Sequence, residues 1–185
     1  FMKKVLFVNN VLYGGGAEKS LIDIVNNLDK NKYKITVLTY YKYSEPYNIL
    51  MPHIKYKYMY DNERLEVEKN NSLIRVIQKR ISYKLLIDRR KYQKFFDDNY
   101  DVVIAFKGGM ISKIVCGVAN NAKIIGWVHE DVLNWHVTKA SFINNFHERA
   151  MYKKFDSVVT VSKYAKNSFE KVFKYSTNTT YVHNG

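Results

Sequence analysis

Short strand-like segments alternate with longer amphipathic segments along this chain of 185 residues, and this alternation restricts the possible fold more than any other feature. Seven segments have the length and composition of strands: residues 3–10, 33–40, 55–60, 101–106, 123–129, 156–161 and 180–183. Most of the segments between them place apolar residues at helical spacing. Strands joined by helices are connected by right-handed crossovers, so we predict a doubly wound α/β domain, Rossmann-like, with a mostly parallel sheet flanked by helices.

The predicted helices differ in charge. Residues 17–28, a short segment that ends near residue 120, residues 140–154 and a segment opened by Ser162 are ordinary amphipathic helices. The longest predicted helix, residues 72–97, carries basic side chains opposite its apolar stripe: Arg75, Lys79, Arg80, Lys84, Arg89, Arg90, Lys91 and Lys94. Such a helix is either a solvated surface element or one that lies on anionic lipid.

The chain is strongly basic, with 30 Lys and Arg against 17 Asp and Glu and a formal net charge of +13. This excess favours a polyanionic partner, but no helix-turn-helix, RNA-recognition or zinc-finger pattern accompanies it, so we expect no nucleic acid. The hydrophobic content of 46% excludes a disordered chain. The single cysteine, Cys116, excludes an intramolecular disulfide and a cysteine-based zinc site. No apolar run is long enough to span a bilayer.

A glycine loop, Gly14 to Gly16, follows the first predicted strand and precedes a helix, where backbone N–H groups can receive a phosphate or carboxylate. The spacing argues against a dinucleotide fingerprint, because Lys19 stands where the third glycine is required. It also argues against a P-loop, because Glu18 stands where a glycine should precede the lysine. A tight turn without a ligand is the remaining alternative.

His129 ends a predicted buried strand and begins a polar segment. At the carboxyl end of a parallel strand an imidazole can orient a sugar hydroxyl or stabilise charge, and the carboxylate of Glu130 can fix its tautomer. A structural histidine is the alternative. A metal site formed by His129, Asp131 and His136 is less favoured, because its ligands are scattered along a loop without cysteine.

Five motifs follow one another along the chain: Gly-Gly-Gly-Ala-Glu-Lys-Ser-Leu at residues 14–21, Asp-Val-Val-Ile at 101–104, Trp-Val-His-Glu at 127–130, the strand at 156–162 that ends in Thr-Val-Ser, and Val-His-Asn-Gly at 182–185. In this order and at this spacing, they resemble the amino-terminal domain of the family 4 retaining glycosyltransferases, which have the GT-B fold. The resemblance covers nearly the whole chain.

The resemblance implies transfer of a hexose from a nucleotide-sugar donor to an acceptor hydroxyl with retention of configuration, without a cofactor or an obligatory metal. It implies that His129 is the catalytic residue. The substrate-binding residues that go with it are Gly14, Gly15, Gly16, Glu130 and Ser162.

The resemblance also implies a partial enzyme. Residues 1–185 correspond to the acceptor-side domain, and the family's donor-binding carboxyl-terminal domain, with its paired glutamates, is not in this sequence. We therefore expect this chain alone to be inactive or nearly so. We expect the parent enzyme to be cytoplasmic, peripheral on the inner membrane face through residues 72–97, and to build a surface polysaccharide or glycolipid. The alternatives are a non-catalytic module that binds anionic membrane or nucleic acid, and a dinucleotide enzyme.

Overall fold

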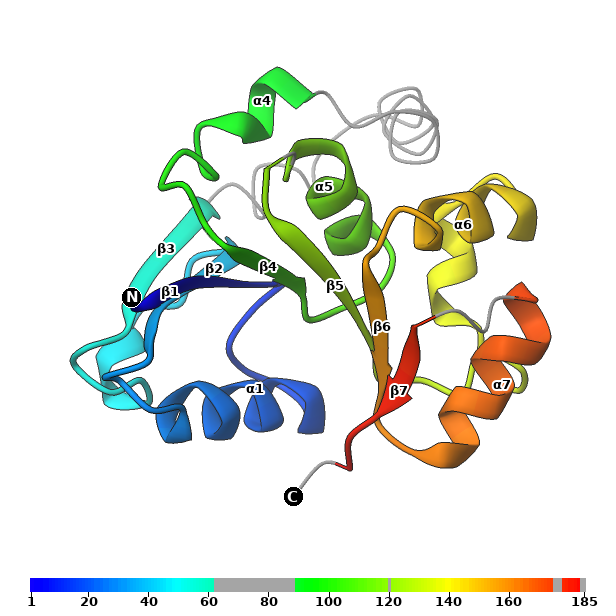
Figure 1. Ribbon diagram of the computed structural model, residues 1–185, viewed down its shortest axis with the longest axis horizontal. Coiled ribbons are helices and arrows are strands. Elements are labelled where there is room, and N and C mark those ends of the chain that lie inside the picture. Colours follow the sequence, from blue (N-terminus) through cyan, green and yellow to red (C-terminus); the bar gives the residue numbers. More distant parts are fainter. Residues whose placement is uncertain (62–88, 120, 175–177, 184–185) are drawn as a thin grey trace, which may run out of the picture.

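The computed structural model of the chain describes residues 1–61, 89–119, 121–174 and 178–183 (Figure 1). Its centre is a seven-stranded sheet in the order β3-β2-β1-β4-β5-β6-β7. The strands are β1 (Lys3–Asn9), β2 (Tyr33–Tyr41), β3 (Lys55–Tyr60), β4 (Val102–Ala105), β5 (Lys123–Val128), β6 (Ser157–Thr160) and β7 (Thr179–Tyr181). Each neighbouring pair is parallel, which confirms the predicted doubly wound α/β architecture.

Helices cover both faces of the sheet. They are α1 (Gly16–Asn27), α4 (Arg89–Gln93), α5 (Met110–Val118), α6 (Asn145–Tyr152) and α7 (Lys163–Phe173), with short 3-10 helices η1 (Pro46–Asn48) and η2 (Val137–Ser141). One core cluster joins Ile114 of α5, Tyr152 of α6 and Phe169 of α7 to one sheet face, and the other joins Leu21 and Val25 of α1 to the opposite face. In Figure 1, α1 accordingly lies below the sheet and α5 above it. None of the described helices is long and apolar enough to span a bilayer.

One predicted helix begins later in the structure than expected, and another is only partly described. The helix expected at residues 140–154 begins only at Asn145, because Asn144 caps it by accepting a hydrogen bond from the backbone N–H of His147 at 2.9 Å. The residues before the cap form η2 instead. Most of the predicted basic helix, residues 72–97, lies outside the described residues, and within them the chain is helical from Arg89 to Gln93.

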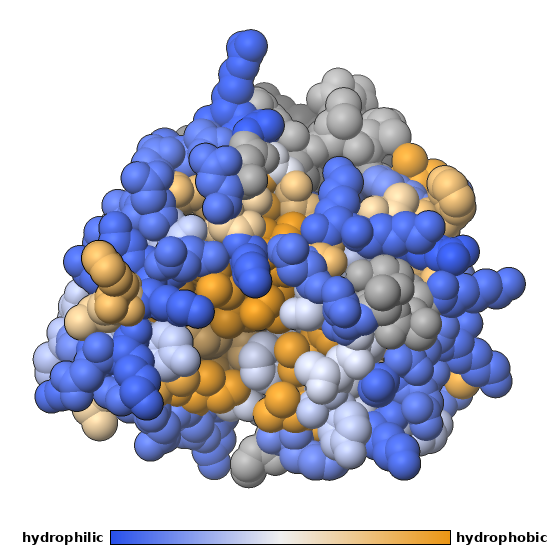
Figure 2. Space-filling view, in the orientation of Figure 1, coloured by the Kyte–Doolittle hydropathy of each residue, from blue (hydrophilic) through white to orange (hydrophobic). Residues whose placement is uncertain are grey.

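The order of the strands locates the place where a ligand is expected. The sheet grows from β1 towards β2 and β3 on one side, and then from β1 towards β4 and the later strands on the other. A switch of this kind leaves a crevice at the carboxyl ends of the two strands beside it, here β1 and β4. Those ends point towards the centre of the view in Figure 1, where Figure 2 shows a hollow with apolar surface and hydrophilic side chains around it.

Candidate functional site

A cavity of about 240 Å³ lies at the carboxyl ends of β1, β4 and β5. The segments after these three strands form one side of it, and η2 forms the other. Its lining residues are Asn10, Lys107, Gly108, Gly109, Met110, His129, Glu130, Val137, Thr138 and Ser141. The predicted catalytic residue His129 and the predicted substrate-binding residue Glu130 therefore both line a cavity at the switch point of the sheet.

His129 directly follows β5 and is packed among aromatic rings. Its ring centroid lies 4.7 Å from that of Phe106 and 6.3 Å from that of Trp127, with which it is stacked at an interplanar angle of 14°. Both ring nitrogens are buried, and neither has a hydrogen bond of good geometry to another described residue. Burial lowers the pKa of His129 to about 4, so the ring is neutral at pH 7.

An ion pair connects the glycine loop to this cavity. Glu18, in the first turn of α1, lies 2.7 Å from the ammonium group of Lys107, which follows β4. The Glu18 side chain is buried and the Lys107 side chain is 40% exposed. Burial is the main influence on the pKa of His129; the backbone of Phe106 and the charge of Glu18 raise this pKa by less, and the charge of Lys107 lowers it.

The glycine loop itself does not line the cavity. Gly14 has φ +105°, a conformation that favours glycine, and a Cβ at Gly15 would lie only 2.8 Å from the Glu18 carboxylate. A Cβ at Gly14 or Gly16 would meet nothing within 4 Å. The loop is thus shaped by its turn and by Glu18, and its contact with a substrate stays a prediction.

A second glycine pair, Gly108 and Gly109, allows η2 to close one side of the cavity. A Cβ on Gly108 would lie 2.5 Å from a methyl group of Thr138. Gly109 has φ +68°, and its Cβ would lie 2.9 Å from the hydroxyl oxygen of Ser141. These glycines were not among the predicted site residues, although a glycine pair directly after a buried strand was a signal for them.

A buried carboxylate fixes η2 and the segment before it. Glu148 of α6 is fully buried, and one of its oxygens lies 2.7 Å from Nε2 of His136. The Thr138 hydroxyl donates to the other oxygen at 2.6 Å. Burial raises the pKa of Glu148, and the contacts with Thr138 and His136 oppose that shift. Sequence reasoning did not find Glu148, because no pattern along the chain connects it to the strand ends.

Glu130 and Ser162 occupy different surroundings. Glu130 is half-buried beside His129, and burial raises the pKa of its carboxyl group. Ser162 follows β6, where its hydroxyl accepts a hydrogen bond from the backbone N–H of Ala165 at 3.0 Å and caps α7. Ser162 does not line the cavity, and its predicted contact with a substrate stays a prediction.

The three residues weighed as a metal site are not brought together. Asp131 accepts hydrogen bonds from the Ser168 hydroxyl and, at 2.6 Å, from the Asn134 amide, whereas His136 faces Glu148. Within the described ranges, no group of three His, Cys, Asp or Glu side chains is placed to hold a metal ion.

Comparison with known proteins gave a family match and a set of structural matches. The family model described as Glycosyltransferase Family 4 matches residues 14–185. No curated protein matches the chain. The structure of Anabaena Alr3699/HepE in complex with UDP and glucose superposes with a TM-score of 0.66 at 16% identity, covering 100% of this chain and 45% of that one. The same protein in complex with UDP-glucose gives a TM-score of 0.63 at 16% identity, covering 98% of this chain and 44% of that one.

At 16% sequence identity, the similarity to the Anabaena protein shows a shared fold and nothing more. The chain spans about 45% of the length of the Anabaena protein.

Proposed function

The chain belongs to glycosyltransferase family 4, and we propose that it is the acceptor-side domain of an enzyme that transfers a hexose from a nucleotide-sugar donor to an acceptor hydroxyl. In this proposal the transfer retains the configuration at the anomeric carbon and has no obligatory metal ion or other cofactor. A UDP-sugar is the first donor to test, because the structurally similar Anabaena protein was solved in complex with UDP-glucose.

The cavity beside His129 is the observation that carries this proposal. Positive charge develops at the anomeric carbon when a glycosidic bond breaks, and the neutral ring of His129 avoids the repulsion that an imidazolium would add. The buried ring nitrogens lack good hydrogen bonds within the described part of the chain, and a sugar hydroxyl that reaches one of them supplies that bond. His129 is therefore the proposed catalytic residue, positioning the reacting sugar.

The other site residues have substrate-binding roles in this proposal. Gly14 and Gly16 leave open space where α1 begins, so backbone N–H groups there can approach a donor phosphate or an acceptor oxygen. Glu130 lines the cavity beside His129 and can accept a hydrogen bond from an acceptor hydroxyl. Ser162 lies at the end of β6 on the same edge of the sheet.

The proposal includes a second domain and a place in the cell. The chain spans under half of the Anabaena protein, which leaves room for a further domain, and the proposal assigns most of the donor binding to a carboxyl-terminal domain. We place the enzyme at the cytoplasmic face of the cell membrane, in the synthesis of a surface polysaccharide or glycolipid. The exposed basic side chains of Arg89, Arg90 and Lys91 support contact with anionic lipid.

The test is sugar transfer by the full-length protein that contains this chain. UDP-glucose and other nucleotide sugars are supplied to the wild type and to the His129→Ala variant. The matched control is His53→Ala, because His53 is an exposed histidine that does not line the cavity. We expect His129→Ala to lower kcat by roughly 10²- to 10³-fold, as for other preorganised polar groups of active sites, and the control to leave it unchanged.

Three outcomes would contradict parts of this proposal. Equal kcat for the wild type and His129→Ala removes the role of His129. A product with inverted anomeric configuration, identified by NMR, removes the retaining mechanism. Loss of transfer in a chelator, restored by a divalent cation, removes the expectation that no metal ion is needed.

A further inference from the structure

A second charged cavity lies at the amino-terminal edge of the sheet, at the opposite ends of the strands from the cavity with His129. Its volume is about 140 Å³, enough for several water molecules. Its lining residues are Lys4, Lys34, Thr36, Lys55, Asp98 and Tyr100. The floor is polar but buried, since Thr36 is 3% exposed and Tyr100 is 7% exposed.

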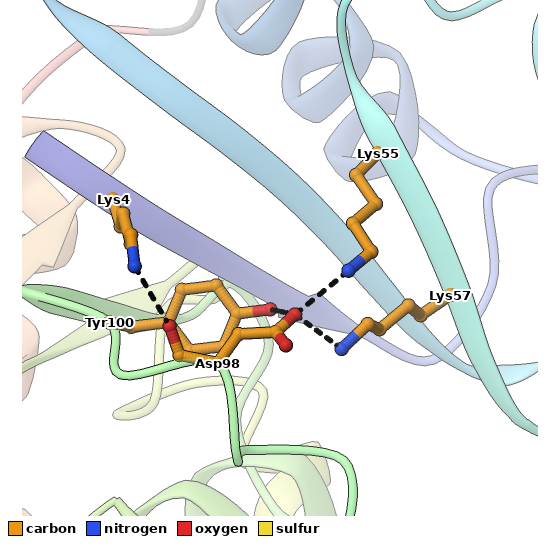
Figure 3. Close-up of polar contacts among 5 residues, drawn as sticks. All are labelled: Lys4, Lys55, Lys57, Asp98 and Tyr100. Atoms are coloured by element: carbon orange, nitrogen blue, oxygen red, sulfur yellow. Dashed lines mark hydrogen bonds and ion pairs between the residues drawn. The ribbon is translucent and has the colours of Figure 1, made fainter. Parts of the chain in front are cut away.

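The register of the sheet places four lysines on one face. Lys4 of β1 pairs with Lys34 of β2, and Thr36 of β2 pairs with Lys55 of β3. Residues two apart on a strand point to the same side, so Lys57 shares the face of Lys55. Figure 3 shows the lysines of β1 and β3 converging from two directions on the segment before β4.

Asp98 is the group on which these lysines converge. One oxygen of its carboxylate lies 2.6 Å from Nζ of Lys57 and 3.0 Å from Nζ of Lys55, and it accepts a hydrogen bond from the Tyr100 hydroxyl at 3.1 Å. Nζ of Lys4 donates to the Asp98 carbonyl oxygen at 3.4 Å. The hydrogen bonds from Lys57 and then Lys55 hold the pKa of Asp98 far below its ordinary value. Lys55 and Lys57 thus share one carboxylate oxygen, and Lys4 contacts the backbone of the same residue.

Protection of the sheet edge explains part of this arrangement. Lysines on an edge strand such as β3 prevent pairing with other chains, which accounts for Lys55 and Lys57. Lys4 and Lys34 lie on the interior strands β1 and β2, where they are directly paired, and like charges in that position repel each other. An anion bound between these two lysines would offset that repulsion.

We propose that Lys4, Lys34, Lys55 and Lys57, here called the amino-edge cluster, bind a phosphate group in competition with the Asp98 carboxylate. A phosphate monoester carries about −1.5 to −2 charges at pH 7 and has three acceptor oxygens, so it can satisfy more lysines than one carboxylate does. The source is either a soluble phosphate ester or the headgroup of a lipid. The site lies at the opposite ends of the strands from the cavity with His129. Phosphate binding there does not depend on the proposed glycosyltransferase activity.

The test titrates inorganic phosphate into the ¹⁵N-labelled 185-residue chain at constant ionic strength, with chloride as the reference anion. We expect saturable amide shifts confined to the strand ends of the amino-edge cluster and to residues 98–100. Lys34→Ala should weaken binding about two- to five-fold, the range for one partly exposed charge contact. Asp98→Asn should tighten it by a similar factor, because the competing carboxylate is removed.

The control is Lys171→Ala, which removes one positive charge from an exposed position on α7. It should leave phosphate binding unchanged. A second arm measures binding to vesicles that contain phosphatidic acid, a phosphomonoester, or phosphatidylglycerol at the same charge density. A preference for phosphatidic acid that is lost in Lys34→Ala assigns the headgroup as the source, and a response to inorganic phosphate alone assigns a soluble ester.

The proposal is overturned if neither probe gives a saturable, localised response. It is also overturned if Lys171→Ala weakens binding as much as Lys34→Ala does. A purely structural Asp98 would give a third contrary result, in which Asp98→Asn loses stability without any gain in phosphate affinity. If Asp98→Asn fails to fold, the phosphate affinities of Lys34→Ala and Lys171→Ala test the proposal, which requires that only Lys34→Ala binds more weakly than the wild type.

Discussion

At the carboxyl edge of the sheet the carboxylates are buried, each beside one basic partner, whereas at the amino edge a partly exposed carboxylate lies among lysines. Glu148 is fully buried beside His136, and the Glu18 side chain is only 6% exposed beside Lys107. At the amino edge the side chain of Asp98 is 41% exposed. A buried charge that loses its partner is costly, while an exposed one is screened by water. The first edge is therefore held in one arrangement, and the second can exchange one anion for another.

Removing Glu148 should give the largest effect on stability and would sharpen this comparison. Glu148→Ala leaves His136 and Thr138 without their buried partner, so we expect the free energy of unfolding to fall by about 3–5 kcal/mol in urea titrations. Glu170→Ala is the matched control, because Glu170 forms a partly exposed pair with Lys166 on α7, and it should cost less than about 1 kcal/mol. Similar losses for the two variants would break the comparison.

The second prediction concerns the pH dependence that the burial of His129 creates. Its pKa is about 4 in the folded chain and near 6.5 when unfolded, so the unfolded state binds more protons between these values. Stability should therefore fall as the pH is lowered, and the contribution of His129 between pH 7 and pH 5 is about 2 kcal/mol.

The measurement compares urea unfolding of the wild type with that of His129→Gln at the two pH values. Burial raises the pKa values of Glu130 and Glu148, which adds stability as the pH falls, but these groups are present in both proteins and cancel in the difference. Parallel pH profiles for wild type and variant would show that His129 is not shielded from water.

The smallest stability effects are expected at the amino edge. Asp98→Asn removes two exposed ion pairs and should change the free energy of unfolding by less than about 1 kcal/mol at physiological salt. The difference from the wild type should shrink further in 1 M salt, which screens exposed charges. If Asp98→Asn lowered the free energy of unfolding as much as Glu148→Ala, the charged groups at the two edges would contribute equally to stability.

Most of the architecture followed from local patterns. Strands such as residues 123–128 are apolar on both faces, and only a strand at the centre of a parallel sheet requires this. The predicted start of α6 was wrong. The apolar periodicity extends further upstream, but the Asn144 side chain caps the helix and fixes its first residue as Asn145. Residues 62–88 lie outside the described residues, so most of the predicted basic helix is untested.

Only some residues of the candidate site could be predicted from the sequence. His129 could be selected from its place at the end of a predicted strand together with the family resemblance, and its catalytic role stays a prediction. The partners that shape its surroundings could not: Lys107 and Glu18 are 89 residues apart, and no local period connects them. In the same way, the excess of lysine was evident, but the register that brings Lys4 beside Lys34 exists only in the sheet.

The position of β1 in the middle of the sheet also bears on how the chain is made. One neighbour of β1 is β2, which follows within the next thirty-odd residues, but the other is β4, whose first residue, Val102, is synthesised long after Asn9. At about 5–20 residues per second, a ribosome takes roughly 5–20 s to cover that interval. During this time the edge of β1 that pairs with β4 has no strand beside it. The nascent chain therefore passes through a stage in which one edge of β1 is open to pairing with other chains.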